Sequence, residues 1–260
     1  FMVFGSGAAQ EMHRRWFESH LDKFNLSYSN RSDEYHGLSI AGPNSRKVLE
    51  KIVRDDVSNE KFKFRDSRRM FVGGVPAIIN RISFTGELGY EIYVAPHYQL
   101  KLYEELMEAG KEFNIKPFGG RALMSMRLEK NWGAWTLDYR PDFTAKETGL
   151  DAFINWDKEF IGKESAQKEN SSNKLVPLIV ETNEIDVTNN EAVLNGDQSI
   201  GYVTSGGFAH FVNKSVAFTF VDQKNIKSEN KIQVEINGDL FNCSIIKEPL
   251  YDPSGQKMRS

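Results

Sequence analysis

The spacing of apolar residues in the first 170 positions predicts a mixture of helices and strands. Over residues 96–113, Tyr103, Leu106 and Met107 lie three, six and seven positions after Leu100, which is the spacing of an amphipathic helix. Similar patterns predict helices over residues 8–24, 43–53 and 121–130. Short apolar runs predict strands over 1–4, 38–40 and 91–94, and a hairpin over 71–84 that turns at Gly73-Gly74. This mixture is typical of an α+β domain.

The last third of the chain has a different pattern, with short apolar runs separated by turn residues. Asn-Gly pairs at 195–196 and 237–238 are strong signals for tight hairpins. The runs recur roughly every ten residues, which indicates a small antiparallel barrel. They lie at residues 176–180, 192–194, 200–203, 215–221, 231–236 and 241–246.

A polar segment over residues 163–174 separates these two patterns. It ends in an unbroken polar run, residues 169–173, and we interpret it as a linker. We therefore predict one domain over residues 1–168 and a barrel domain over 174–260. Because the chain opens with an apolar run of strand character, we also expect it to be a fragment with its N-terminal part missing.

Composition narrows the function classes. The 260 residues are 40% apolar, which supports a packed core, and the net charge of −3 gives no general attraction to nucleic acid or to an anionic membrane. The single cysteine, Cys243, excludes an intramolecular disulfide and a cysteine-based zinc cluster, and it is expected to be a buried strand thiol. The five histidines lack paired spacing, so no metal site is expected.

Candidate chemistry is concentrated in residues 83–91, where two carboxylates stand among two glycines. Gly86 and Gly89 let the backbone turn tightly and let a flat ligand approach closely. A carboxylate at such a turn, from Glu87 or Glu91, accepts hydrogen bonds from two adjacent donors at once. The amino-pyrimidine edge of a pterin or of guanine offers such a donor pair. The alternative interpretation is a hairpin with two solvated acids at its tip.

Six segments, in order, resemble the glycine-cleavage T-protein (aminomethyltransferase) family. The features shared with that family are a Gly-Pro-x-x-Arg helix start, the Gly-Glu-x-Gly-x-Glu turn, an Arg-Leu-Glu helix and three further short motifs. They lie at residues 42–46, 83–91, 125–130, 144–150, 160–164 and 201–206, with Ala145 where the family has proline. Trp135, Asp138 and the tail over 249–259 resemble the sarcosine and dimethylglycine dehydrogenase branch, in which a folate-binding half follows an FAD-containing half.

The resemblance implies an α+β T-protein-like folate-binding domain with mixed sheets and helices, followed by a small antiparallel β-barrel domain. It also implies a tetrahydrofolate site. Glu91 matches the acid that binds the pterin's amino-pyrimidine edge, and Glu87 either shapes the turn or is a solvated loop acid. Phe84 stands where the family commonly has tyrosine, so the stacking face is kept and the hydroxyl is lost.

Three further residues are folate-binding candidates by the same resemblance. Arg127 could face the folate or form a structural ion pair, and Trp135 could pack on the ligand's ring system or in the core. Ser6 lies where the family has an asparagine near the folate. Arg46 matches the Gly-Pro-x-x-Arg arginine and is interpreted as structural.

The catalytic residue of this chain is unknown, because the family's catalytic aspartate precedes the position that corresponds to residue 1. The Gly5-Ser6-Gly7 segment lacks the third glycine of a dinucleotide-binding motif, so FAD would belong only to the missing half of the intact protein. A step that loses a positioned acid or base slows by roughly 10²–10⁴-fold. We expect this fragment to keep most of its folate-facing surface and little catalysis of its own.

The function implied is one-carbon transfer to tetrahydrofolate within an FAD-dependent sarcosine or dimethylglycine dehydrogenase, forming 5,10-methylene-tetrahydrofolate. The expected partners are folate, an iminium or formaldehyde derived from the N-methyl amine, and the FAD oxidase half of the same chain, with no nucleic acid or membrane. The alternatives are a free-standing aminomethyltransferase or related demethylase, and a non-catalytic folate-binding module. The expected location is the bacterial cytoplasm, or the mitochondrial matrix in a eukaryote.

Overall fold

The computed structural model describes residues 1–182, 184–226 and 231–260. They form two compact units, and each is described by itself. The first unit contains residues 1–123 and 252–260, and the second contains residues 124–251. In the described ranges, no helix has both the length and the apolar character needed to cross a membrane.

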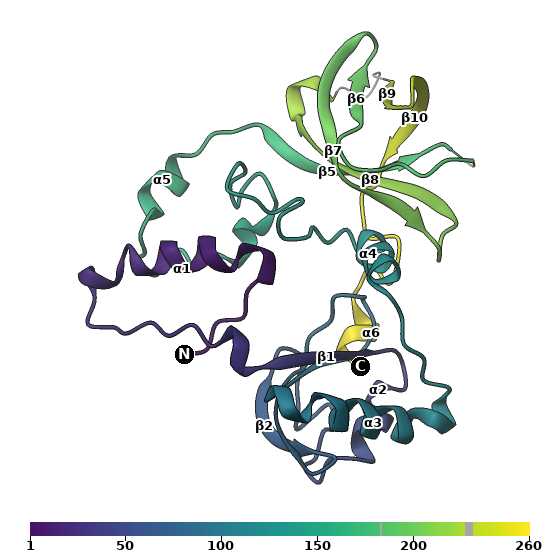
Figure 1. The fold of residues 1–260 in the computed structure, drawn as a ribbon. Coiled ribbons are helices and arrows are strands. Elements are labelled where there is room, and N and C mark those ends of the chain that lie inside the picture. Colours follow the sequence, from purple (N-terminus) through teal and green to yellow (C-terminus); the bar gives the residue numbers. More distant parts are fainter. Residues whose placement is uncertain (183, 227–230) are drawn as a thin grey trace. The chain divides into compact units, whose positions relative to one another are not determined.

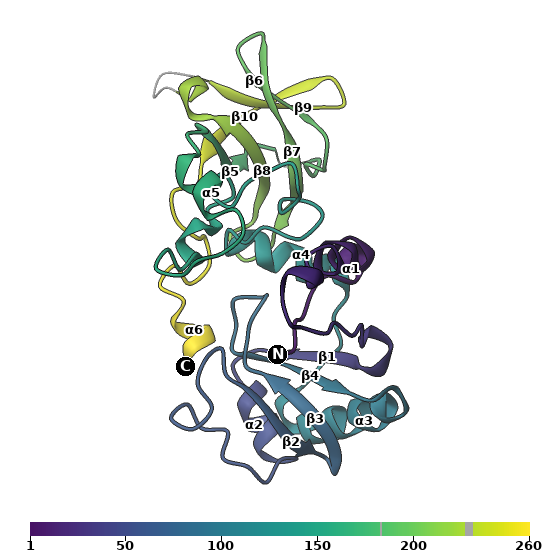
Figure 2. The ribbon, with the colours of Figure 1, turned by 90° about the vertical axis from the view of Figure 1, so that its left-hand side faces the viewer.

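The first unit is built on a four-stranded antiparallel sheet with the order β1-β4-β3-β2. Its strands are β1 (His36–Ala41), β2 (Ser67–Val72), β3 (Val75–Asn80) and β4 (Gly89–Val94). Two helices, α2 (Ser45–Glu50) and α3 (Gln99–Gly110), cover one face of this sheet (Figure 2). The predicted turn at Gly73-Gly74 is confirmed: both glycines have positive φ, 56° and 80°, as a tight two-residue hairpin requires.

Side chains along β4 alternate between a face buried in the core and a polar face. Tyr90, Ile92 and Val94 are buried in the core with α3, whereas Glu91 and Tyr93 between them are only partly buried and point the other way. Leu102 and Leu106 of α3 complete the core at the helical spacing that the sequence indicates. The polar face of β4 therefore carries the carboxylate identified from the sequence.

The N-terminal region departs from the prediction in two ways. The strand predicted over residues 1–4 is wrong, because an isolated apolar run forms a strand only beside a pairing partner, and none of the described strands pairs with it. The helix predicted over 8–24 is shorter: α1 spans Gln10–Glu18, between one-turn 3₁₀ helices at Gly7–Ala9 and Leu21–Lys23. Two further one-turn 3₁₀ helices lie at Ser32–Glu34 and Pro96–Tyr98, and α3 ends in a third at Lys111–Phe113.

The second unit contains a closed six-stranded antiparallel barrel with the order β10-β5-β8-β7-β6-β9 (Figure 1). Its strands are β5 (Asn173–Val180), β6 (Ala192–Asn195), β7 (Gln198–Ala209), β8 (Lys214–Asp222), β9 (Ile232–Ile236) and β10 (Asp239–Ile245). Asn237 and Gly238, with φ of 54° and 92°, form the tight turn between β9 and β10. The fold class predicted from the sequence, α+β with a C-terminal antiparallel barrel, is confirmed.

Three short helices complete the chain. The boundary between the units falls within α4 (Gly120–Glu129), α5 (Lys163–Lys168) lies in the second unit, and α6 (Gln256–Arg259) returns to the first. Residues 150–153 and 223–225 form 3₁₀ turns. The helix α5 occupies the first half of the predicted linker, so the linker is shorter than expected. The domain division between residues 168 and 174 rests on composition and stays a prediction.

Candidate functional site

Three polar residues lie side by side across the polar face of the first unit's sheet. In the strand register, Glu91 of β4 lies directly opposite Ser39 of β1 on one side and directly opposite Asn80 of β3 on the other. Directly opposed residues in antiparallel strands project from the same face with Cβ atoms roughly 4.5–5.5 Å apart. The sequence-predicted carboxylate thus stands at the centre of a polar row.

The carboxylate of Glu91 is oriented by Tyr93, two residues further along the same strand. The Tyr93 hydroxyl donates to Glu91 Oε2 at 2.5 Å. Burial, and next this hydrogen bond, raises the pKa of the Tyr93 phenol above its ordinary range, so the phenol stays a donor at neutral pH. Among the described residues no second donor contacts Glu91, which leaves Oε1 available to a ligand.

The ring of Tyr93 is itself fixed by its neighbours. It lies across Gly37 of β1, where a Cβ atom would come within 2.9 Å of the ring carbon Cε1. The ring of Phe4 also packs against it, with a centroid distance of 4.7 Å and a tilt of 43°. Because the side chain at position 37 is absent, the tyrosine can lie flat on the strand, and the hydroxyl that holds Glu91 has little freedom to move.

The loop over residues 83–88 carries two more predicted folate ligands. Gly86 has a φ of 86°, and its N–H donates to Ser83 Oγ at 3.0 Å, so the glycine serves the turn, as the sequence indicates. Glu87 is partly buried, and one of its oxygens lies 4.0 Å from the Lys257 amine of the tail. Phe84 is partly buried in the same loop.

Ser6 lies in the loop before the first 3₁₀ turn of the N-terminal region. Its side chain is partly buried and makes no capping hydrogen bond to that turn, whereas its carbonyl accepts the Ala9 N–H at 3.1 Å. The first unit therefore contains four of the six predicted folate ligands: Ser6, Phe84, Glu87 and Glu91.

Arg127, in the second unit, forms a buried ion pair. Its Nη1 donates to Asp138 Oδ2 at 2.9 Å and to the Trp132 carbonyl at 3.0 Å, and the side chain is 1% exposed. Burial lowers the pKa of the guanidinium, and the ion pair with Asp138 acts in the opposite direction. Of the two roles left open from the sequence, these contacts correspond to the structural ion pair.

Trp135 lies in the loop between α4 and Asp138, and it is 55% exposed. Its ring meets the edge of Tyr139 at a centroid distance of 5.8 Å, and the Asp138 carboxylate accepts the Ala134 N–H at 2.8 Å. The indole is therefore presented on a loop that the Arg127–Asp138 pair holds, and its exposure differs from that of an ordinary core tryptophan.

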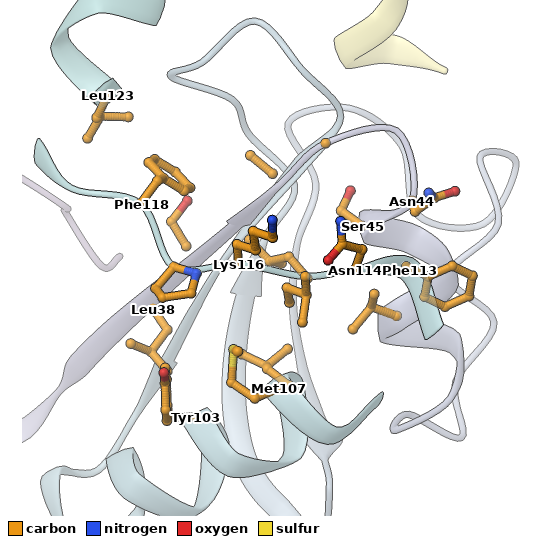
Figure 3. Close-up of a pocket in the computed structure, with 18 of the residues that line it drawn as sticks. Leu38, Asn44, Ser45, Tyr103, Met107, Phe113, Asn114, Lys116, Phe118 and Leu123 are labelled. Atoms are coloured by element: carbon orange, nitrogen blue, oxygen red, sulfur yellow. The ribbon is translucent and has the colours of Figure 1, made fainter. Parts of the chain in front are cut away.

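A separate apolar pocket of about 560 Å³ lies on the helix side of the first unit. Leu38 reaches it from β1, Tyr103 and Met107 from α3, and Lys116 and Phe118 from the segment after α3 (Figure 3). None of the six predicted folate ligands is among its lining residues. Ser39 of the polar row does line the pocket, so the two adjoin at β1 while the predicted folate ligands themselves lie outside the lining.

Sequence reasoning identifies Glu91 as a candidate ligand but misses two neighbours that shape its surroundings. Tyr93 could have been found, because the spacing of two in a strand puts it on the face of Glu91. Asn80 could not have been found in this way, because its position opposite Glu91 depends on the strand register. Asp138 matches the resemblance to the dehydrogenase branch, but no sequence pattern identifies it as the partner of Arg127.

Two family comparisons cover most of the chain. Residues 1–158 match the GCVT N-terminal domain, and residues 173–252 match the glycine cleavage T-protein C-terminal barrel domain. A solved structure, the glycine cleavage system aminomethyltransferase T from Bartonella henselae, shares the fold with a TM-score of 0.77 at 22% identity. That match covers 96% of this chain and 68% of the other.

Relatives of two kinds are similar in sequence. The mitochondrial dimethylglycine dehydrogenase of Homo sapiens is 34% identical over 94% of this chain, which spans 29% of that protein's length. An aminomethyltransferase of Thermoanaerobacter sp. (strain X514) is 30% identical over 99% of this chain and 70% of its own length. The chain therefore belongs to the glycine cleavage T-protein family, and the resemblance identified from the six motifs is confirmed.

Proposed function

We propose that this chain binds tetrahydrofolate against the polar row around Glu91. It would serve as the one-carbon transfer part of an FAD-dependent N-methyl amine demethylating dehydrogenase. The observation that carries the folate proposal is the arrangement of Glu91: a partly buried carboxylate, held by Tyr93 and placed beside a buried amide. Membership of the aminomethyltransferase family supports the reaction class.

The residues of the polar row fit the amino-pyrimidine edge of a reduced folate. Glu91 would accept the ring N–H and the exocyclic amine together, and hydrogen bonds to the ionised carboxylate are the stronger kind. Phe84 is proposed as a stacking face, since the family's tyrosine is replaced here by a side chain with the same flat surface. Glu87 and Ser6 are proposed as neighbours that shape the loops around the ligand.

The two predicted ligands of the second unit have proposed roles of different kinds. Trp135 is proposed to pack on the folate's ring system, since its indole is exposed. Arg127 is proposed to act indirectly, because its guanidinium is engaged by Asp138 and by the Trp132 carbonyl. By holding these two residues it fixes the loop that presents Trp135.

The chemistry proposed for these residues is orientation and the exclusion of water. The carbon of an iminium derived from sarcosine or dimethylglycine would form bonds to two nitrogens of the bound folate, giving 5,10-methylene-tetrahydrofolate and releasing the demethylated amine and a proton. Formaldehyde would give the same product with loss of water. The bound folate outcompetes water for the one-carbon unit, because its amine is already held in position. FAD and the catalytic aspartate are proposed to belong to the rest of the intact protein, so this chain is expected to bind folate better than it catalyses.

Two enzymatic functions within the same family are candidates. The proposal of a dehydrogenase part is supported by 34% identity to the human dimethylglycine dehydrogenase, and a free-standing aminomethyltransferase by 30% identity over almost the whole chain. The upstream reading frame separates them. A strand-linked Gly-x-Gly-x-x-Gly motif several hundred residues earlier favours the dehydrogenase, and a start codon within about 100 residues favours the alternative. A non-catalytic folate-binding module is the third candidate.

Calorimetric titration of 5-formyl-tetrahydrofolate tests the folate site. Glu91→Ala removes the acceptor of two donors and should cost on the order of 2–4 kcal/mol, roughly a 30- to 700-fold rise in Kd. The matched control is Glu235→Ala, which removes an exposed strand glutamate from β9 of the barrel and should leave Kd unchanged. An unaltered Kd in Glu91→Ala would remove Glu91 from the site.

A further inference from the structure

Asn80 is a buried polar side chain whose hydrogen bonding is incomplete. It is 7% exposed, and its Oδ1 has no hydrogen-bond partner among the described residues. Leaving a buried acceptor unpaired costs about 1–3 kcal/mol, and folded proteins keep few such groups. Rotation of the amide by 180° would bring its N–H, a donor, to the position of this unpaired oxygen.

The register directs this amide toward the same place as Glu91. The two residues are directly opposite on neighbouring strands, and their side chains project from the same face. Tyr93 already holds one oxygen of Glu91 from further along β4. A flat ligand whose edge lies on Glu91 therefore extends over either Asn80 or Ser39, and of these two only Asn80 is buried.

We propose that Asn80 is a specificity-determining residue of this site and hydrogen-bonds the ring carbonyl next to the donor pair held by Glu91. The inference rests on the proposed folate function. The pyrimidinone ring of a folate carries an amine, a ring N–H and a carbonyl in succession along one edge. A carboxylate accepts from the first two, and the amide N–H of asparagine donates to the third. The Glu91 carboxylate and the Asn80 amide would together hydrogen-bond all three groups along this edge of the ring.

This role predicts opposite effects on stability and on binding. In the ligand-free protein the amide lacks a partner, so replacing it with an apolar side chain of similar size removes an unpaired polar group. Such a change is close to neutral or stabilising. The bound ligand would instead lose a hydrogen bond and keep an unpaired buried carbonyl. A residue that only supports the fold would lose stability and leave the affinity unchanged.

The experiment compares Asn80→Leu with the wild type in two measurements, urea denaturation and calorimetric titration of 5-formyl-tetrahydrofolate. The expected result is an unchanged or higher stability together with a Kd about five- to tenfold higher, the factor that one lost hydrogen bond supplies. Asn80→Ala gives the same binding measurement if leucine proves too bulky. The double variant Glu91→Ala/Asn80→Leu should lose less affinity than the sum of the single changes, because both side chains hold one edge.

The matched control is Asn195→Leu. Asn195 is a strand asparagine of the barrel whose Nδ2 donates to the Asn225 carbonyl at 3.2 Å, so its replacement should lower stability and leave Kd unchanged. Failure of the wild type to bind the folate overturns the proposed function, and this inference with it. Folate binding by the wild type with an unchanged Kd in both Asn80 variants overturns the inference alone.

Discussion

Arg127 and Asp138 form an ion pair in which the two side chains are 1% and 0% exposed. The Asp138 carboxylate also accepts from the Ala134 N–H and from the hydroxyls of Thr204 and Ser205. Its two oxygens are thereby saturated, as a buried carboxylate requires. The pair joins the end of α4 and the loop carrying Trp135 to strand β7 of the barrel.

Removing the acid from this pair should destabilise the second unit strongly. Asp138→Ala leaves the Arg127 charge buried without its partner, and a loss of about 3–5 kcal/mol is expected in the free energy of unfolding. Urea denaturation followed by tryptophan fluorescence measures it. Asp239→Ala, which removes an exposed aspartate at the start of β10, serves as the control. A loss below about 1 kcal/mol would show that the pair contributes no more than a surface pair does.

Two arginines hold the tail of the chain in place. Arg46 and Arg81 both donate to the Ser260 carbonyl at 2.7 Å. Arg81 is fully buried and also donates to the Phe62 carbonyl, and burial lowers the pKa of its guanidinium. These bonds place α6 beside the 83–88 loop, where Lys257 lies near Glu87.

Replacing Arg81 should release this tail. Arg81→Met fills much of the same volume, leaves the Phe62 carbonyl without its donor and leaves the Ser260 carbonyl with Arg46 alone, with an expected loss of about 1–3 kcal/mol. Limited trypsin digestion reports the release directly, through faster cleavage after Lys257 and Arg259. Arg54→Met, at an exposed arginine, should leave the cleavage rate unchanged. Equal rates for the wild type and Arg81→Met would contradict the tail-anchoring role.

The parts of the fold that the sequence predicted are those in which local pattern and tertiary structure agree. The barrel strands were found because apolar alternation and the Asn-Gly turn at 237–238 indicate the same hairpin. The strand predicted over residues 1–4 is wrong because a strand forms only where another strand pairs with it. The polar composition of the 163–168 segment favours a linker, yet the segment forms α5, with a Lys168–Glu164 ion pair at helical spacing.

The candidate site also contains residues that local sequence pattern identifies and residues that depend on tertiary structure. Glu91 stands in a motif that can be recognised in the sequence, and Tyr93 follows at a spacing that places it on the same face. The alignment of Asn80 with Glu91 depends on how β3 pairs with β4, which no local pattern specifies. The partner of Arg127 lies eleven positions further on, beyond the end of its helix, so it depends on the path of a loop.

Cys243 should be unreactive in the folded protein. Burial raises the pKa of its thiol to about 12, so little thiolate is present at pH 8. Alkylation by iodoacetamide at pH 8 is expected to be slow in the native protein and rapid in urea, as mass spectrometry of the intact chain would show. Fast alkylation without denaturant would contradict the burial of this thiol.

The same shift predicts how stability depends on pH. The unfolded thiol ionises near pH 8.5 and the folded thiol only near pH 12, so between these values the folded state binds more protons. Stability therefore falls as pH rises through this window, by about 1–2 kcal/mol between pH 8 and pH 10. Cys243→Ser lacks this ionisation, so the difference in unfolding free energy between the wild type and the variant should change over that range. A constant difference would show that the thiol does not contribute.

Tyr93 should control the affinity of the Glu91 site without touching the donor pair of the ligand. Its hydroxyl donates to Glu91 Oε2 at 2.5 Å, and its ring packs against Gly37 and Phe4. Tyr93→Phe keeps the ring and removes only this hydrogen bond, so Glu91 gains rotational freedom that the ligand must then restrict. The expected result is a Kd for 5-formyl-tetrahydrofolate about five- to tenfold higher, with little change in stability. Tyr103→Phe, on α3 beside the apolar pocket, should bind as the wild type does.

Because Glu91→Ala already removes the group that Tyr93 orients, adding Tyr93→Phe to it should have no further effect. A further loss of affinity in that double variant would mean that Tyr93 contacts the folate itself.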